Sequence, residues 1–482
     1  MEQPLAFPLD IPVRGRLQAL HGQLRSAILD GRLRTGQPLP STRSLATSLG
    51  LSRNTIVAAY DRLLSEGYIV SRQGAGYVVA HAGPTQASPS RSTTGEERRL
   101  QPQWRDAVFP APMNALPPAR YDLRVGLPDA SRFPFEAWRK LSARALRSLS
   151  RTPSFYDAAT GREALREAIA GHVSFTRAVT CSAADIMVVG GAQQAFDLLA
   201  RILVTPGHTV VAVEDPGYPP LRQTFEATGA LIVPVPVDDE GLVVEQIPPN
   251  ARVIYVTPSH QFPSGMAMSP ARRAALLDFA RRNQAVIVED DYDGEFRYGG
   301  RPLDALQTLD RDGSVFYIGT FSKSLFPSLR LGYLVAPAWA MPALACVRQL
   351  GDRHSDVLAQ DTLALFINEG HLARHVRKMR RIYAERREAL LEALSRHSGD
   401  ALQPLASDAG LHIAVQLRWP VPASQLVKDA QAVNMRIEAL GDYAIGDSRP
   451  NGLVFGLGGM PATRMDEAAR VLAQLLQAHR PG

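Results

Sequence analysis

Six short apolar runs between residues 186 and 337 constrain the fold of this chain more than any other feature. The runs are IMVVGG (186–191), TVVAVED (209–215), RVIYVTP (252–258), AVIVEDD (285–291), SVFYIGT (314–320) and LGYLVAP (331–337). They are continuous rather than alternating, as strands buried on both faces are, and helical stretches separate them. The pattern predicts an α/β domain with a mostly parallel sheet and helices on both of its faces.

Polar residues gather where these runs end. In a parallel sheet the carboxyl ends of the strands share one edge, and ligands bind in the crevice beyond that edge. The first run ends in two glycines before a helix, and such a helix N-terminus offers free backbone amides to an anion. The residues that we place at this edge are Ala192, Gln193, Tyr218, Asp290, Tyr292, Ser322, Lys323 and Arg330.

Lys323 and Asp290 fit two chemical demands of pyridoxal phosphate (PLP). The aldehyde needs an amine, which Lys323 supplies as a Schiff base, and the ring nitrogen needs a carboxylate that keeps it protonated, which Asp290 supplies. A lysine alone is more often solvated. Their joint occurrence in this chain order favours a PLP site.

The other residues at this edge fit the remaining parts of the cofactor. We expect Arg330 and Ser322 to bind the phosphate, together with the amides at the start of the helix. Tyr218 suits stacking on the ring, and Tyr292 suits a hydrogen bond to the phenolate oxygen. A tyrosine at a strand end is otherwise a packing residue, so both assignments depend on the lysine and the aspartate.

The first 80 residues have a different pattern. Apolar residues recur at helical spacing in two segments before residue 50, and SRNTIVAAYDRLLSEGY (52–68) combines an apolar stripe with a polar first turn. The stretch YIVSRQGAGYVVA (68–80) alternates around a glycine-rich turn, which is typical of a β-hairpin. Two helices joined by a tight turn and followed by a hairpin predict a winged helix-turn-helix, whose recognition helix enters the DNA major groove.

Basic charge is concentrated in the same region. Residues 1–80 hold nine arginines, no lysine and five acids, whereas the other 402 residues hold 44 basic and 42 acidic side chains. Such an excess suits binding to a polyanion, although a basic run by itself is more often a solvated surface.

Cysteine content and hydropathy indicate the cellular compartment of the protein. The two cysteines, Cys181 and Cys346, exclude a disulfide framework and a cysteine-rich zinc site, and we predict no metal. The start of the chain has no secretion signal, and no apolar stretch reaches about 20 residues. We therefore expect a cytoplasmic protein without a membrane span.

The segment LPSTRSLATSLGLSRNTIVAAYDRLLSEGYIVSRQGAGYVV (39–79) closely resembles the winged helix of the GntR family of transcription regulators. The resemblance implies a double-stranded DNA operator as partner, with arginines at the groove or phosphates, polar side chains beside them and a glycine at the wing tip. An alternative for the two serines is that they only cap helices. The implied DNA-binding residues are Ser41, Arg43, Ser52, Arg53, Asn54, Thr55 and Gly74.

Three regions follow from these patterns. We predict a DNA-binding domain over residues 10–80, a flexible linker over residues 81–104, where Pro, Ser, Thr, Gly and charged residues dominate, and a PLP-binding domain over residues 105–482.

The second region resembles fold type I, class I/II aminotransferases over about residues 120–475. The motifs GGAQQ, EDPGYP, TPSHQFPSG, EDDYDGEFRY and GTFSKSLFPSLRLGY match the MocR-type regulators most closely, in which a GntR winged helix is fused to this fold. The resemblance implies a smaller C-terminal α/β subdomain over about 372–482, a homodimer with a head-to-tail arrangement, and a Tyr156 that reaches the partner subunit's phosphate. It also implies that Lys323 anchors PLP for sensing rather than turnover.

Three departures from the aminotransferase pattern bear on activity. Phe262 precedes the proline where many aminotransferases have asparagine, and Pro220 stands where an amino-acid-sensing relative has arginine. Asn451 stands where a transaminase commonly has the arginine that grips the substrate carboxylate, and Arg449 is a possible substitute. Losing such clamps disfavours turnover of ordinary amino acids.

Two functions therefore stay open. The first, which we favour, is a transcription regulator whose PLP domain senses PLP itself, an amine or an amino acid and alters DNA binding. The second is a working aminotransferase with a DNA-binding appendage.

Overall fold

The structure is a computed structural model that describes residues 5, 7–12, 14–72, 76–80, 104, 119–151, 155–299, 303–446 and 449–480. The chain separates into two compact units, Met1–Phe109 and Pro110–Gly482. The predicted linker, residues 81–104, lies outside the described residues except for Trp104. None of the described helices is both long enough and apolar enough to cross a lipid bilayer.

The first unit is a three-helix bundle with a hairpin, as the sequence predicted. Its elements are α1 (Arg16–Leu29), α2 (Thr42–Leu49), α3 (Arg53–Ser65), β1 (Ile69–Arg72) and β2 (Gly76–Val79). Strands β1 and β2 pair antiparallel. Gly50 ends α2 with a φ of 62°, a left-handed conformation that glycine adopts without steric cost and that produces the tight turn into α3.

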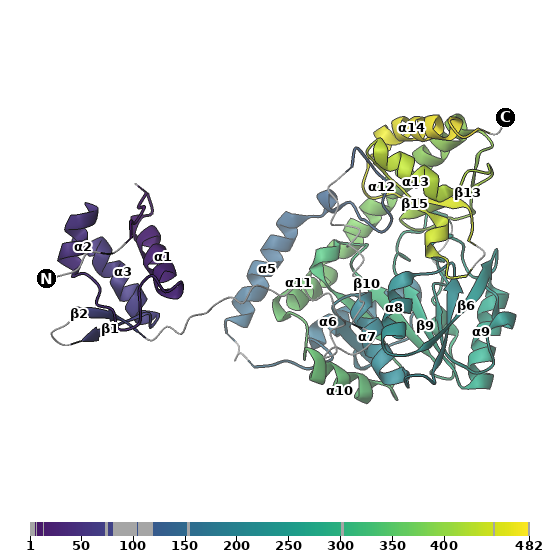
Figure 1. Ribbon diagram of the computed structural model, residues 1–482. Helices are drawn as coiled ribbons and strands as arrows, with labels where there is room; N and C mark the ends of the chain where they lie inside the picture. Colours follow the sequence, from purple (N-terminus) through teal and green to yellow (C-terminus); the bar gives the residue numbers. More distant parts are fainter. Residues whose placement is uncertain are drawn as a thin grey trace. The chain divides into compact units, whose positions relative to one another are not determined.

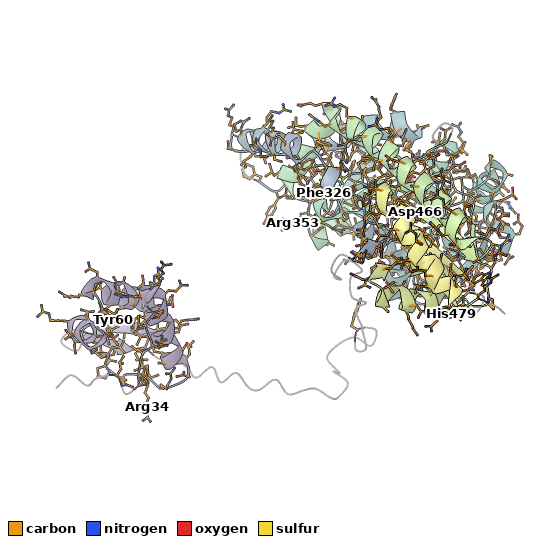
Figure 2. All side chains as sticks on the ribbon, turned by 90° about the horizontal axis from the view of Figure 1, so that it is seen from above. Arg34, Tyr60, Phe326, Arg353, Asp466 and His479 are labelled. Carbon is orange, nitrogen blue, oxygen red and sulfur yellow. The ribbon has the colours of Figure 1, made fainter. Side chains whose placement is uncertain are left out.

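Tyr60 lies at the centre of this bundle. Its side chain is fully buried among the helices (Figure 2), and its hydroxyl donates a 2.9 Å hydrogen bond to the carbonyl of Pro40. The same stripe of α3 buries Ile56, Ala59 and Leu63. The apolar stripe predicted from the sequence therefore packs inward, which leaves the polar first turn of α3 at the surface.

The second unit is built on an eight-stranded sheet with the order β4-β11-β10-β9-β8-β5-β6-β7. The strands are β4 (Ile186–Val189), β5 (Val210–Asp215), β6 (Leu231–Asp238), β7 (Gly241–Leu242), β8 (Ala251–Val256), β9 (Val286–Asp291), β10 (Val315–Thr320) and β11 (Gly332–Val335). All six predicted strands are present.

The strand directions bring the predicted ligand edge together. Strands β5, β6, β8, β9 and β10 run parallel. Strand β11 runs antiparallel to both β10 and β4, so β4 shares the common direction. The carboxyl ends of β4, β5, β8, β9 and β10 therefore lie along one edge of the sheet, as expected for a mostly parallel sheet.

Helices cover both faces of this sheet, as Figure 1 shows. One face packs against α7 (Ala192–Leu203), α8 (Pro219–Ala227) and the start of α10 (Met341–Gly351). The other face packs against α9 (Pro270–Asn283), α6 (Glu163–Arg177) and α11 (Val357–Asn368), and α11 also contacts α5 (Phe135–Leu149).

A smaller C-terminal part follows α12 (His371–Ser398). Its four-stranded sheet has the order β12-β13-β16-β15, and α13 and α14 lie over it in yellow-green and yellow in Figure 1. The elements are β12 (Leu402–Pro404), β13 (His412–Leu417), α13 (Ala423–Ala432), β14 (Met435–Arg436), β15 (Glu438–Ala439), β16 (Gly452–Gly456) and α14 (Met465–Gln477). Two side chains at this end, Asp466 and His479, are labelled in Figure 2.

One early segment joins the small sheet to the large one. Strand β3 (Tyr121–Asp122) pairs parallel with β14, and the carbonyl of Leu123 accepts a 2.7 Å bond from the amide of Gly456. The chain then continues through Val125 and Gly126. These two residues are thereby held between the C-terminal strands and the edge of the large sheet.

Candidate functional site

Lys323 lies in the loop after β10, at the edge where the strands end. Its Nζ donates a 2.7 Å hydrogen bond to the carbonyl of Gly126. Gly126 has a φ of +79°, which favours glycine, and a Cβ at this position would lie 2.9 Å from Nζ of Lys323 and displace the end of that side chain. Burial lowers the pKa of Lys323, and the carboxylates of Asp293 and Asp290 oppose that shift. A lowered amine pKa favours the neutral form that attacks an aldehyde.

Asp290 is the penultimate residue of β9, which pairs with β10, the strand that precedes the loop of Lys323. Its Oδ2 accepts a 2.9 Å hydrogen bond from the hydroxyl of Tyr255, whereas its Oδ1 is buried without a hydrogen-bond partner. Burial raises the pKa of Asp290 to about 7. The neighbouring Asp291 points to the other face of β9, where it pairs with Arg177 at 2.6 Å. Of these two neighbours, Asp290 therefore offers an open carboxylate oxygen to a ligand.

An anion cradle is present at the start of α7. Gly191 caps this helix with a φ of 94°, and a Cβ there would lie 3.2 Å from Nη1 of Arg330. Strand β11 begins at Gly332, and a Cβ at that position would lie 3.1 Å from Cα of Gly191, so the two glycines allow a close approach of the segments. The guanidinium of Arg330 thus lies at the positive end of the α7 dipole, which suits a phosphate.

The other predicted phosphate ligands belong to the same two segments. Ala192 and Gln193 are the first residues of α7, where helix amides lack intrahelical acceptors. Ser322 lies between β10 and Arg330, is half-buried, and its amide donates to Thr320 Oγ1 at 3.1 Å. The fold therefore brings together the predicted amides, hydroxyl and guanidinium. Their role in binding phosphate stays a prediction.

Tyr218 and Tyr292 belong to the same site. Tyr218 precedes α8, and its ring meets Phe262 edge to face at 5.2 Å. Burial and the negative charge of Asp290 raise the pKa of Tyr218 above its usual value. The hydroxyl of Tyr292 donates to the carbonyl of His260 at 3.0 Å and lies 2.9 Å from the Nδ1 of that ring. Both tyrosines are close to Asp290, and their contacts with a cofactor stay predictions.

A buried polar network lies behind Tyr292, and sequence reasoning missed it. His260 Nδ1 lies 3.1 Å from both carboxylate oxygens of Asp293, and the rings of His260 and His412 are 4.7 Å apart. Burial acts to raise the pKa of Asp293, but the charge and hydrogen bond of His260 hold it below its usual value. The histidine in TPSHQFPSG was the available signal, because a buried histidine needs a hydrogen-bond partner.

The positions that depart from the aminotransferase pattern have other roles here. Asn451 Oδ1 accepts from the amide of Ala423 at 2.8 Å, and its Nδ2 donates to the carbonyl of Val421 at 3.0 Å. Asn451 therefore ties two parts of the small sheet region together rather than facing a ligand. Arg449 is exposed.

Tyr156 lies on the surface, with 74% of its side chain exposed. The guanidinium of Arg353, labelled in Figure 2, lies 4.2 Å from the centre of its ring. Phe155 beside it is 85% exposed. Two adjacent exposed aromatic residues are unusual on a monomer surface and suit a protein–protein contact.

The predicted DNA-binding residues lie at the first turns of α2 and α3. Ser41 accepts from the amide of Ser44 at 3.2 Å, and Ser52 accepts from the amide of Thr55 at 3.2 Å, so both serines cap helices. Arg53 is the first residue of α3 and is exposed.

The remaining members of the set have similar placements. Arg43 and Asn54 are exposed, and Thr55 is half-buried with its hydroxyl 2.8 Å from that of Ser52. Gly74 lies outside the described residues. A capped helix N-terminus that is flanked by arginines suits a phosphate, so capping and DNA contact are compatible.

Comparisons with known proteins agree with both halves of this description. Residues 17–79 match the family of bacterial regulatory proteins, gntR family, and residues 121–436 match aminotransferase class I and II. The "probable rhizopine catabolism regulatory protein MocR" of Rhizobium meliloti is 36% identical over 96% of this chain and 93% of its own length. The chain belongs to the MocR-type subfamily of GntR transcription regulators.

Other similar proteins include a regulator and an enzyme. The HTH-type pyridoxine biosynthesis transcriptional regulator PdxR of Corynebacterium glutamicum is 33% identical over 94% of this chain and 92% of its own length. The kynurenine aminotransferase of Pyrococcus horikoshii, solved in complex with PMP, has 27% identity and a TM-score of 0.70. The structural match covers 75% of this MocR-type chain and 91% of the enzyme. The chain is thus a GntR-type DNA-binding regulator fused to an aminotransferase fold.

Proposed function

We propose that this regulator binds PLP at Lys323 and uses it to sense a small molecule that changes how the winged helix binds its operator. The observation that carries the proposal is the carboxylate of Asp290, which is buried with Oδ1 unpaired on the strand next to Lys323. A buried polar atom without a partner is costly, so it indicates a ligand donor at that point. The protonated ring nitrogen of PLP is such a donor.

Each predicted residue has a defined task in this proposal. Lys323 anchors the cofactor as a Schiff base, and Asp290 holds the proton on the ring nitrogen. The phosphate lies at the start of α7, bound by Arg330, by Ser322 and by the amides of Ala192 and Gln193. Tyr218 stacks on the ring, and Tyr292 donates to the phenolate oxygen. When bound, PLP supplies an electrophilic carbon that exchanges one amine for another and a ring that withdraws electrons.

A homodimer follows from the same proposal. Tyr156 and Phe155 are exposed beside the loop that carries Arg353, and we propose that a second copy of the chain covers them, in a head-to-tail dimer where Tyr156 reaches the partner's phosphate. Sedimentation of the wild type and of Tyr156→Ala tests this part. A dimeric wild type, together with a PLP affinity that is lower in Tyr156→Ala than in the wild type, agrees with this part of the proposal. A monomeric wild type contradicts it.

The experiment that tests the whole proposal combines absorbance with DNA binding. Full-length protein is titrated with PLP, and DNA that the protein selects from a random pool is then bound with and without the cofactor. We expect a Schiff-base absorbance band and a change in operator affinity. A protein that stays colourless in excess PLP contradicts the proposal.

An active aminotransferase is the alternative, since the second unit has the fold of these enzymes. The structural role of Asn451 disfavours it, because the residue where transaminases commonly place the carboxylate-binding arginine is occupied in packing. Incubation with amino donors and a keto acid separates the two functions. Multiple turnovers would favour the enzyme, and a spectral change that stops after one equivalent would favour the sensor.

A further inference from the structure

Glu438 is a half-buried carboxylate near Lys323, and it has no role in the PLP site proposed above. Lys323 Nζ donates to the carbonyl of Gly126 at 2.7 Å, and the amide of the preceding Val125 donates to Oε1 of Glu438 at 2.8 Å. The same two-residue segment therefore holds both side chains. The hydroxyl of Tyr443 donates to the other carboxylate oxygen of Glu438.

The charges around the lysine amine are all negative. The charged groups that act on Lys323 are Asp293, Asp290 and Glu438. Arg124 acts on Glu438 through its charge, but its guanidinium is engaged elsewhere, because Arg124 Nε donates to Asp122 Oδ1 at 2.8 Å. A ligand carboxylate placed next to Lys323 would thus meet a carboxylate of the protein, which is repulsive at short range.

Aromatic rings lie on the same side of the site as Glu438. The ring of Tyr443 meets that of Phe262 edge to face at 4.9 Å, and Phe262 meets Tyr218 in the same way at 5.2 Å. A carboxylate near aromatic rings is the composition of sites that bind organic ammonium ions, since both kinds of group attract positive charge. Burial also raises the pKa of Glu438, so a nearby cation would restore its charged form.

We propose that Glu438 and Tyr443 bind a second ammonium group on the effector, so that the sensed molecule is a diamine rather than an amino acid. One amine of the ligand engages the cofactor at Lys323, and the other lies against the carboxylate of Glu438 and the surrounding rings. This inference rests on the proposed function, because it assumes PLP at Lys323. It goes further by assigning the chemical class of the effector and the residue that selects it.

The test compares two ligands of equal length on the PLP-loaded full-length protein. Cadaverine has an ammonium group at each end, and δ-aminovalerate has a carboxylate at one end. Both are titrated while the Schiff-base absorbance is followed. We expect cadaverine to change the spectrum at a concentration at least about tenfold lower than δ-aminovalerate does, as a charge-assisted hydrogen bond to a carboxylate predicts.

The variant Glu438→Gln keeps the shape of the side chain and removes its charge. We expect it to retain the absorbance band and to reduce the preference for cadaverine by about tenfold or more. The control Glu467→Gln removes a carboxylate that pairs with Arg120 on the surface of the same subdomain, and it should leave the preference unchanged. The retained band shows that a variant is folded and binds PLP.

Several outcomes would overturn the inference alone. These are an unchanged preference in Glu438→Gln, a coloured wild-type protein whose spectrum neither ligand alters, or a preference for δ-aminovalerate that disappears in Arg449→Gln. A wild-type protein that never acquires the band would instead overturn the proposed function and this inference with it.

Discussion

The hydroxyl of Tyr255 donates a 2.9 Å hydrogen bond to Oδ2 of Asp290 and leaves Oδ1 of the same carboxylate buried and unpaired. The two residues lie near the carboxyl ends of adjacent strands, β8 and β9. Tyr255 thus fixes the orientation of the carboxylate, so that its second oxygen is available to a ligand.

This geometry predicts the effect of Asp290→Asn. An amide in this position cannot stabilise a protonated ring nitrogen by charge, so we expect PLP affinity to fall by about 1.5–3 kcal/mol. Absorbance titration of the apo-protein with PLP measures the change. The control Asp278→Asn alters an exposed carboxylate on α9 that pairs with Arg282. Equal PLP affinity in Asp290→Asn and the wild type would contradict the assignment.

Lys323→Ala should abolish the Schiff base. The Nζ of Lys323 lies at the ligand edge of the sheet, and its hydrogen bond to Gly126 orients it there. We expect the variant to lose the absorbance band and the PLP label that borohydride reduction fixes on the protein. Mass spectrometry of the reduced protein measures the label, with Lys140→Ala as a surface control. A label that persists in Lys323→Ala would assign the bond to another lysine.

Arg53→Ala should weaken operator binding by about 1–3 kcal/mol if Arg53 contacts a base. Arg53 begins the recognition helix α3 and is exposed. Fluorescence anisotropy with the selected DNA measures the loss, and its salt dependence separates a base contact from a phosphate contact. Arg62→Ala is the matched control, because Arg62 is exposed at the other end of the same helix. An operator affinity equal to that of the wild type would exclude a contact.

The strand ends were predictable because they depend on local patterns. A continuous apolar run indicates a buried strand, and the residue that follows it lies at the sheet edge whichever strands are neighbours. This reasoning placed Asp290, Lys323 and Arg330 together. Strand β6 was missed, because Pro234 and Pro236 interrupt a run that is largely half-buried or exposed near the end of the sheet.

The other side of the pocket was not predictable in the same way. Glu438 reaches Val125 across 313 positions of the chain, and Gly126 meets Lys323 across 197. Such contacts depend on how the small sheet packs against the large one, and no local pattern encodes that. The resemblance to aminotransferases pointed to Asn451 and Arg449 instead, and the structure gives Asn451 a packing role.

A buried histidine gives the chain a defined sensitivity to acid. His412 is 2% exposed, and its Nε2 lies 3.0 Å from the carbonyl of Pro263. Burial and the nearby His260 lower the pKa of His412 to about 3. An unfolded chain has an ordinary histidine pKa of about 6.5. Between these two values the unfolded state binds a proton that the folded state does not, so the free energy of unfolding falls as the pH falls through 6.5.

The size of this effect follows from the same two pKa values. Between about pH 7 and about pH 5, one such histidine lowers the free energy of unfolding by about 2 kcal/mol. His412→Asn removes the titrating group. Between about pH 7 and about pH 5 we therefore expect the free energy of unfolding to fall by about 2 kcal/mol less in the variant than in the wild type. Urea unfolding of the full chain measures it through its four tryptophans, all of which lie outside residues 10–80. Histidines that do not contact His412 contribute equally to both proteins, so the difference reports His412 together with its coupling to His260. Identical slopes would show that His412 binds its proton equally well in the folded and unfolded states.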